Sequence, residues 1–200
     1  MLMGNLPKKE GKVGQDEGAN LIYQMGVTVK GVRPPIWRRL QVTGCTKLGA
    51  LHGILQAVMG WSDRHLHEFN IHGIPYGDAS QSPAENVIDE NAVNLSQLIS
   101  DEKQRFLYVY DLADNWEHEI LVERVLPIDE GTHYPVCLNG RRSCPPEDCG
   151  GPRRYAKLLE TIRNPSHPQY EETWDRVGEN FDPERFDIKS VNARLEEFQR

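Results

Sequence analysis

The sequence predicts an α+β fold, with a mainly antiparallel, roll-like sheet, one early helix packed on it and a C-terminal helical cap. Three observations predict this class. Extended segments with alternating apolar residues dominate residues 20–126, one helical pattern interrupts them near residue 50, and helical patterns close the chain. Strands that come first and helices that come last are typical of α+β proteins, whereas α/β proteins alternate the two.

The first elements are a hairpin and a helix. Strands are expected at Leu21–Lys30 and over residues 34–42, and the prolines between them belong at a strand start or a sheet edge. Thr46 can cap a helix that runs to about Met59, because apolar residues then recur at helical spacing. Gly60 suits the end of that helix.

The middle of the chain carries the remaining expected strands. One strand would place His65, His67, Phe69 and Ile71 on one face, because side chains alternate along a strand. A short partner at Ile74–Tyr76 and a short helix capped by Asn94 follow. Strands at Phe106–Leu112 and Trp116–Leu126 form a hairpin, because the Asp-Asn pair between them favours a turn.

The last third is expected to be a loop and three helices. The segment Pro127–Gly151 is rich in Pro, Gly and Cys, which predicts a long loop. Pro152 opens the first helix, residues 170–177 carry the second, and residues 188–198 carry the third. The domain organisation expected is a disordered N-terminal tail over residues 1–19 and a single domain over residues 20–200.

Composition limits the classes of function. The 200 residues carry a net charge of -7, which disfavours nonspecific binding to nucleic acid. No apolar run approaches the roughly 20 residues that span a bilayer, so no membrane association is expected. The first 20 residues lack the apolar core of a secretory signal, so we expect a cytoplasmic protein with free thiols or metal-bound cysteines. The oligomeric state stays open.

A polar cluster on the expected strands is the first candidate site. Its members are histidines, aspartates and one tryptophan from two segments: Asp63, His65, His67, Asp111, Asp114, Trp116 and His118. If the two segments pair, His65, His67 and His118 could converge on one metal ion, with an aspartate orienting a ligand. The alternative is a set of buried, hydrogen-bonded histidines that only stabilise the core.

The cysteine-rich loop is the second candidate site. His133, Cys137, Cys144 and Cys149 lie within 17 residues of one another and offer the nitrogen and sulfur donors of a structural zinc site. Their spacing lacks the compact Cys-x2-Cys pair. The alternative is a set of half-buried thiols in a loop rich in turns.

The chain resembles the plasmid pRiA4b ORF-3-like family. The resemblance is carried, in order, by RPPIWRRLQV, LHGILQAVMGWSDRHLHEF, YVYDLADNWEHEI, CPPEDCGGPRRYAKLL, NPSHP and FDPERFD, and it runs from about residue 20 to 198. The matching residues are Arg33, Pro34, Trp37, Arg38, His52, Trp61, Asp63, His65, His67, Tyr110, Asp111, Asp114, Trp116, His118, Cys144, Pro145, Pro146, Glu147 and Asp148.

The resemblance implies an α+β roll-like domain that occurs on plasmids and near mobile elements, with no established activity and no assigned catalytic residue. The chain departs from the family pattern at Leu112-Ala113, where relatives tend to have an aromatic residue and a glycine, and at Cys149. The first departure leaves the local shape of the hairpin turn open. The second restricts any zinc role of Cys149 to this chain.

Three functional hypotheses follow. The leading one is a non-enzymatic interaction or regulatory module with a protein partner, because Trp37, Trp61 and Trp116 are of the kind that anchors interfaces. The second is a metal-dependent, hydrolase-like enzyme built on the three histidines of the polar cluster. The third is a nucleic-acid-associated protein that uses the basic side chains Lys30, Arg33, Arg38 and Arg39.

Overall fold

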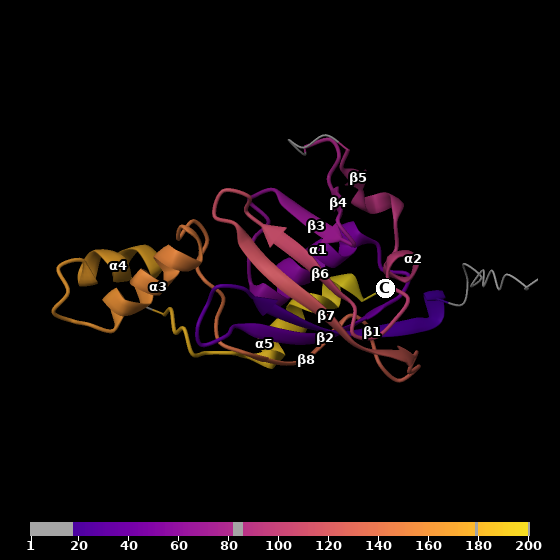
Figure 1. Cartoon of the computed structure of the whole chain (residues 1–200). Helices are drawn as coiled ribbons and strands as arrows, with labels where there is room; N and C mark the ends of the chain where they lie inside the picture. Colours follow the sequence, from indigo (N-terminus) through magenta and orange to yellow (C-terminus); the bar gives the residue numbers. More distant parts are fainter. Residues whose placement is uncertain (1–17, 82–85, 179, 200) are drawn as a thin grey trace, which may run out of the picture.

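The fold is an eight-stranded sheet with helices on one face. The computed structural model describes residues 18–81, 86–178 and 180–199. The strand order is β5-β4-β3-β6-β7-β1-β2-β8 (Figure 1). The strands are β1 Leu21–Val29, β2 Trp37–Thr43, β3 His67–Ile71, β4 Ile74–Gly77, β5 Ile88–Asp89, β6 Arg105–Tyr110, β7 Trp116–Pro127 and β8 Val136–Arg141. All pairs are antiparallel except β4 with β5, which confirms the α+β class and the mainly antiparallel sheet.

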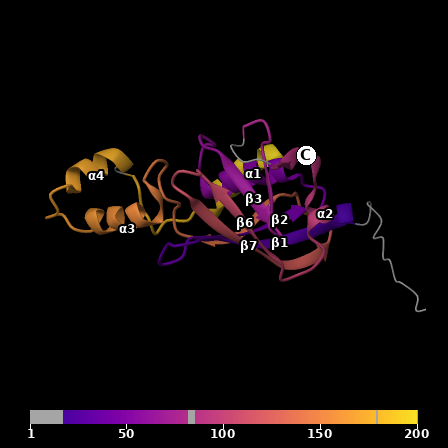
Figure 2. The same ribbon diagram turned by 45° about the horizontal axis from the view of Figure 1, so that its top comes forward.

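The two faces of the sheet differ in chemistry because side chains alternate along each strand. One face buries Tyr108 of β6 and Ile120 of β7, and helices α1 and α5 cover it (Figure 2). The opposite face carries ion pairs, including Lys30 with Glu117. The apolar face of the sheet therefore holds the core.

The helices begin and end close to the expected residues. They are α1 Leu48–Met59, α2 Leu95–Leu98, α3 Gly151–Ile162, α4 Tyr170–Val177 and α5 Ile188–Leu195, with 3-10 turns η1 Gly18–Asn20, η2 Glu90–Ala92 and η3 Glu196–Phe198. Gly60 ends α1 in a left-handed conformation with φ 88°, as the sequence predicts. The expected capping by Thr46 is wrong, because Lys47 occupies the cap position and makes no side-chain bond there.

The C-terminal helices occupy two places. Helices α3 and α4 lie side by side beyond the end of the sheet (Figure 1), whereas α5 returns to contact α1 and β8. Only α5 therefore caps the sheet itself. No helix among the described residues is long and apolar enough to cross a membrane. The tail expected over residues 1–19 lies outside the described residues as far as residue 17.

The segment expected to be one long loop contains strand β8. Its side chains do not alternate cleanly between apolar and polar, and Asn139-Gly140 is a turn signal, so the sequence pattern hides it. Backbone pairing with β2 decides the conformation, with Leu40 opposite Cys137. The expectation of a loop over the whole of Pro127–Gly151 is therefore wrong for these six residues.

The buried Arg38 joins four parts of this fold. It is 2% exposed, and its guanidinium donates to the carbonyl oxygens of Val58 at 2.9 Å, Arg141 at 3.0 Å and Arg142 at 2.8 Å. Its charged group also lies 4.7 Å from the ring centroid of Phe186. Arg38 therefore satisfies a carbonyl at the end of α1 and fixes the end of β8, so it is not available to bind nucleic acid.

We predict that Arg38→Met destabilises the protein by about 3 kcal/mol, because several buried carbonyl groups lose their only charged donor. Urea unfolding measures the change. The matched control is Arg39→Met, which removes a partly exposed ion pair with Glu123 and should cost less than about 1 kcal/mol. Equal losses in the two variants would contradict the role assigned to Arg38.

A second prediction concerns the fully buried His118. Burial lowers the pKa of His118 to about 4, whereas an unfolded histidine titrates near 6.5. Between these values only the unfolded chain takes up the proton, so stability is full above pH 6.5 and falls as the pH drops toward 4, by about 3 kcal/mol in all.

Urea unfolding at pH 7 and pH 5 tests this pH dependence. His118→Gln should flatten it, because glutamine does not titrate. The matched control is His133→Gln, at an exposed position, which should leave the pH dependence as it is in the unchanged protein. The same slope in His118→Gln as in the control would contradict the prediction.

Candidate functional site

A polar cavity of about 320 Å³ lies where the loop after α1 meets the start of β3. Its walls come from five parts of the chain: His52, Asp63, Arg64, His65, Leu66, His67, Glu68, Asp78, Gln81, Glu90 and Leu112. Three of the expected cluster residues, Asp63, His65 and His67, therefore share one cavity. His52 and Glu90 complete it from α1 and η2.

A chain of hydrogen bonds holds His52 in the cavity wall. The side-chain amide of Gln56 donates to the hydroxyl of Tyr108 at 3.0 Å, and that hydroxyl lies 2.8 Å from Nδ1 of His52. Nε2 of His52 lies 2.8 Å from Oδ1 of Asp63. The backbone N–H of Asp63 donates back to Oε1 of Gln56 at 3.0 Å, which closes the loop.

The direction of each proton in this chain follows from the donors available. Gln56 uses its oxygen for the N–H of Asp63, so its nitrogen must donate to Tyr108. Tyr108 is fully buried, and the acceptor left for its own O–H is Nδ1 of His52. His52 then carries its proton on Nε2 and donates it to Asp63. Burial lowers the pKa of His52, which favours this neutral form.

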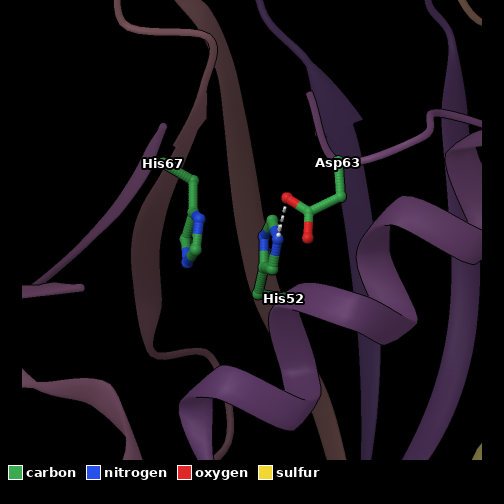
Figure 3. A group of neighbouring side chains, drawn as sticks. All are labelled: His52, Asp63 and His67. Atoms are coloured by element: carbon green, nitrogen blue, oxygen red, sulfur yellow. Dashed lines mark hydrogen bonds and ion pairs between the residues drawn. The ribbon is translucent and has the colours of Figure 1, made fainter. Parts of the chain in front are cut away.

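His67 packs face to face on His52. The ring centroids are 3.4 Å apart and the planes differ by 5°. Figure 3 shows His52 between the ring of His67 and the carboxylate of Asp63. Nε2 of His67 lies 2.7 Å from Oε2 of Glu90, and both side chains are about nine-tenths buried. Each of the two stacked imidazoles thus has its own carboxylate.

The stacking prevents His52 and His67 from binding one metal ion together, although their ligand atoms and that of Asp63 lie within 4.8 Å of one another. Atoms of stacked rings in contact are about 3.5 Å apart, so the centroid distance of 3.4 Å is the separation of the two ring planes, with almost no sideways offset. An imidazole binds a metal in its own ring plane at about 2.1 Å. An ion in the plane of one ring would lie too far from the other ring.

His65 faces two aspartates on the other side of the loop. Its Nε2 lies 2.9 Å from Oδ1 of Asp148 and 3.7 Å from Oδ2 of Asp111, and the three ligand atoms lie within 4.8 Å of one another. This Nε2 is buried but makes no hydrogen bond of acceptable geometry. The sequence predicted that His65 and His67 lie on one face of a strand, but His65 precedes β3, which begins at His67.

Hydrogen bonds between loops set the position of these aspartates. Asp114 accepts the backbone N–H of Gly150 at 2.7 Å, which ties the β6–β7 turn to the cysteine-rich loop. Asp63, Asp111 and Asp148 all have left-handed backbones, with φ of 52°, 52° and 57°. Such conformations cost roughly 1 kcal/mol or more for a residue with a side chain and cluster at functional sites.

The three-histidine metal site expected from the sequence does not form. His65, His67 and His118 are not a group of ligand atoms within reach of one ion among the described residues. His118 lies inside the core, with Nδ1 at 3.3 Å from the carbonyl oxygen of Tyr108.

Trp116 is 2% exposed and Trp61 is 8% exposed, so neither anchors an external partner.

The structure does not bring together the ligands of the expected zinc site. His133, Cys137, Cys144 and Cys149 do not form a group of three within ligand distance among the described residues. Burial raises the pKa of Cys144 to about 11 and that of Cys149 to about 12, which disfavours the thiolate. These cysteines act as small apolar side chains in the packing.

Sequence reasoning missed His52, Glu90 and Asp148 as site residues. His52 had a signal, since it lies on the apolar face of a helical pattern, one turn after Leu48. Glu90 lies in a polar, irregular segment that gives no local cue. Asp148 was named only among the residues that match the family pattern.

The hydrogen-bond chain leads to a testable prediction about His52. Long-range ¹H–¹⁵N correlation spectra should show the neutral imidazole protonated on Nε2. Tyr108→Phe removes the donor to Nδ1 and should shift this tautomer balance, with a loss of about 1–3 kcal/mol in unfolding free energy. The control is His167→Gln, at a partly exposed position, which should leave the tautomer of His52 unchanged. A proton on Nδ1 in the unchanged protein would contradict the assignment.

Comparisons with known proteins identify the family of this chain and two similar proteins. The model of the plasmid pRiA4b ORF-3-like protein family matches residues 21–190. The uncharacterized protein y4hQ of Sinorhizobium fredii (strain NBRC 101917 / NGR234) is 33% identical over 178 residues, which are 88% of this chain and 91% of that protein. The crystal structure of MM3350, a protein of unknown function from Methanosarcina mazei Go1, is 37% identical with a TM-score of 0.78, and the match covers 86% of this chain and 97% of that chain. The chain therefore belongs to the plasmid pRiA4b ORF-3-like protein family.

Proposed function

We propose that this protein is a non-enzymatic regulatory module whose cavity binds a small organic cation, such as an aliphatic amine. The observation that carries the proposal is the charge of the cavity wall. Four carboxylates (Asp63, Glu68, Asp78 and Glu90) line it with a single arginine, Arg64. The plasmid-associated family supports a role in a plasmid or mobile-element context.

The excess of negative charge does not depend on the histidines. His52 is neutral in the hydrogen-bonded arrangement, and a proton on His67 would still leave more carboxylates than cations in the wall. Hydrogen bonds from Ser80 lower the pKa of Asp78, and hence keep it ionised. A cationic ligand would therefore be attracted to this wall, whereas an anionic ligand would be repelled.

The size and rigidity of the cavity suit a small ligand. About 320 Å³ is at the lower end of ligand pockets, which favours a molecule the size of a diamine over a nucleotide. The hydrogen bonds around His52 and the ring stacking on His67 position the wall before a ligand arrives. Such preorganisation reduces the entropy cost of binding.

The chemistry of the wall favours binding over hydrolysis. Both ring nitrogens of His52 have partners, so His52 is not free to take a proton from a substrate. The described lining residues include no serine, threonine or cysteine as a nucleophile. Two of the basic side chains expected to bind nucleic acid are engaged within the fold, since Arg38 is buried and Arg39 pairs with Glu123.

We predict that a diamine or triamine, such as putrescine or spermidine, binds this protein in calorimetric titration at low ionic strength with EDTA present. Asp63→Asn should weaken binding about threefold to tenfold, because it removes one wall charge while its amide oxygen still accepts from His52. Glutarate, a dicarboxylate of similar length, should not bind.

The matched control is Glu171→Gln, which removes one negative charge from the exposed surface of α4. It should bind the amine as the unchanged protein does. Absence of binding by either amine, or equal weakening in the two variants, would refute the proposed ligand class. Equal binding of glutarate would show that wall charge does not select the ligand.

A further inference from the structure

We propose that His65, Asp111 and Asp148 form a binding site for a divalent transition-metal ion, Zn²⁺ or Mn²⁺, beside the cavity. The three side chains come from three separate segments: the loop after α1, the β6–β7 turn and the cysteine-rich loop. Their ligand atoms, one nitrogen and two oxygens, lie within 4.8 Å of one another. This site takes His65 and Asp111 from the polar cluster expected from the sequence and adds Asp148, which neither expected site contained.

The distances between the ligand atoms suit an ion. Ligands about 2.1 Å from a metal, at tetrahedral or octahedral angles, lie roughly 3.0–3.4 Å from one another. Nε2 of His65 lies 2.9 Å from Oδ1 of Asp148 and 3.7 Å from Oδ2 of Asp111, values on either side of that range. Small side-chain rotations therefore suffice to bring all three atoms into coordination.

One of the three ligand atoms is buried without a hydrogen-bond partner. Nε2 of His65 is buried and makes no hydrogen bond, although Oδ1 of Asp148 lies 2.9 Å away. Asp111 is 5% exposed, and only its Oδ1 accepts hydrogen bonds, from the backbone N–H groups of Ala113 and Asp114 at 3.1 Å each. Its Oδ2 is left directed toward His65. Buried polar atoms without partners are rare and point to a missing ligand.

The surrounding loops hold the three side chains in this arrangement. The bonds to Oδ1 fix the orientation of the Asp111 carboxylate, so that Oδ2 must face His65. The bond from Gly150 to Asp114 fixes the neighbouring loop, where Asp148 is held with φ 57°. A Cβ on Gly151 would lie 2.5 Å from the carbonyl oxygen of Asp114, so only glycine allows this close approach.

The donor set selects the class of ion. One imidazole and two carboxylates suit Zn²⁺ and Mn²⁺ better than Mg²⁺ or Ca²⁺, which prefer oxygen ligands alone. The alternatives in the described chain are weaker, since the stacked rings of His52 and His67 cannot share an ion and no described cysteine belongs to a group of three ligand atoms within reach of one ion. Three protein ligands leave at least one coordination position for water or a second molecule.

Calorimetric titration of the metal-free, full-length protein with Zn²⁺, and separately with Mn²⁺ and Mg²⁺, tests the site. We expect one Zn²⁺ or Mn²⁺ per chain and no comparable Mg²⁺ binding. His65→Gln and Asp111→Asn should each weaken binding by at least about tenfold, because each removes a direct ligand. Asp111→Asn keeps the oxygen that accepts from Ala113 and Asp114, and a thermal melt without metal verifies its fold.

The matched controls are His167→Gln, at a partly exposed position, and Asp175→Asn, at an exposed one, which make the same chemical changes outside the three loops. Both should bind the ion as the unchanged protein does. No binding of Zn²⁺ or Mn²⁺ at millimolar concentration, or unaltered binding in His65→Gln and Asp111→Asn, would overturn the proposal.

A direct spectroscopic readout complements the titration. The ¹⁵N shift of His65 Nε2 should change when Zn²⁺ binds, whereas that of His52 should not. The amine titration of the proposed function is carried out in EDTA, so it does not depend on a bound metal ion. Asp111→Asn should still bind the amine while it loses metal binding. Failure of one proposal is therefore separable from failure of the other.

Discussion

The hydrogen-bond chain from Gln56 through Tyr108 and His52 to Asp63 is the constraint on which the cavity depends. It joins α1, β6 and the loop after α1, and each proton in it has one direction because Tyr108 is fully buried. A buried donor without a partner costs about 1–3 kcal/mol, so no member can turn away independently. The loop that carries Asp63 and His65 is fixed as a result.

Arg38 supplies the corresponding constraint at the other end of α1. Its donors bind carbonyl oxygens from α1 and from the end of β8, so the part of the cysteine-rich loop that follows β8 is anchored to the sheet. The same loop is held at its far end by the bond from Gly150 to Asp114. Two independent anchors therefore place Asp148 opposite His65, although the two residues are distant in the sequence.

The sequence predicted the elements better than it predicted the site. Alternation of apolar residues located the central strands, and helical spacing located α1, but strand β8 gave no such pattern and depends on pairing with β2. Asp63, His65 and His67 were identified and do share a cavity. His118 was grouped with them from its strand face, yet that face is directed into the core, where burial lowers its pKa to about 4.

Sequence by itself determined the α+β class, the antiparallel hairpins and the family, because these follow from local periodicity and from motifs that are contiguous in the chain. Only the tertiary structure decided which imidazole meets which carboxylate. His52 pairs with Asp63, His67 with Glu90, and His65 lies against Asp111 and Asp148. The physical reason is that these partners come from separate loops, whose relative positions are set by buried hydrogen bonds between distant residues and not by any spacing along the chain.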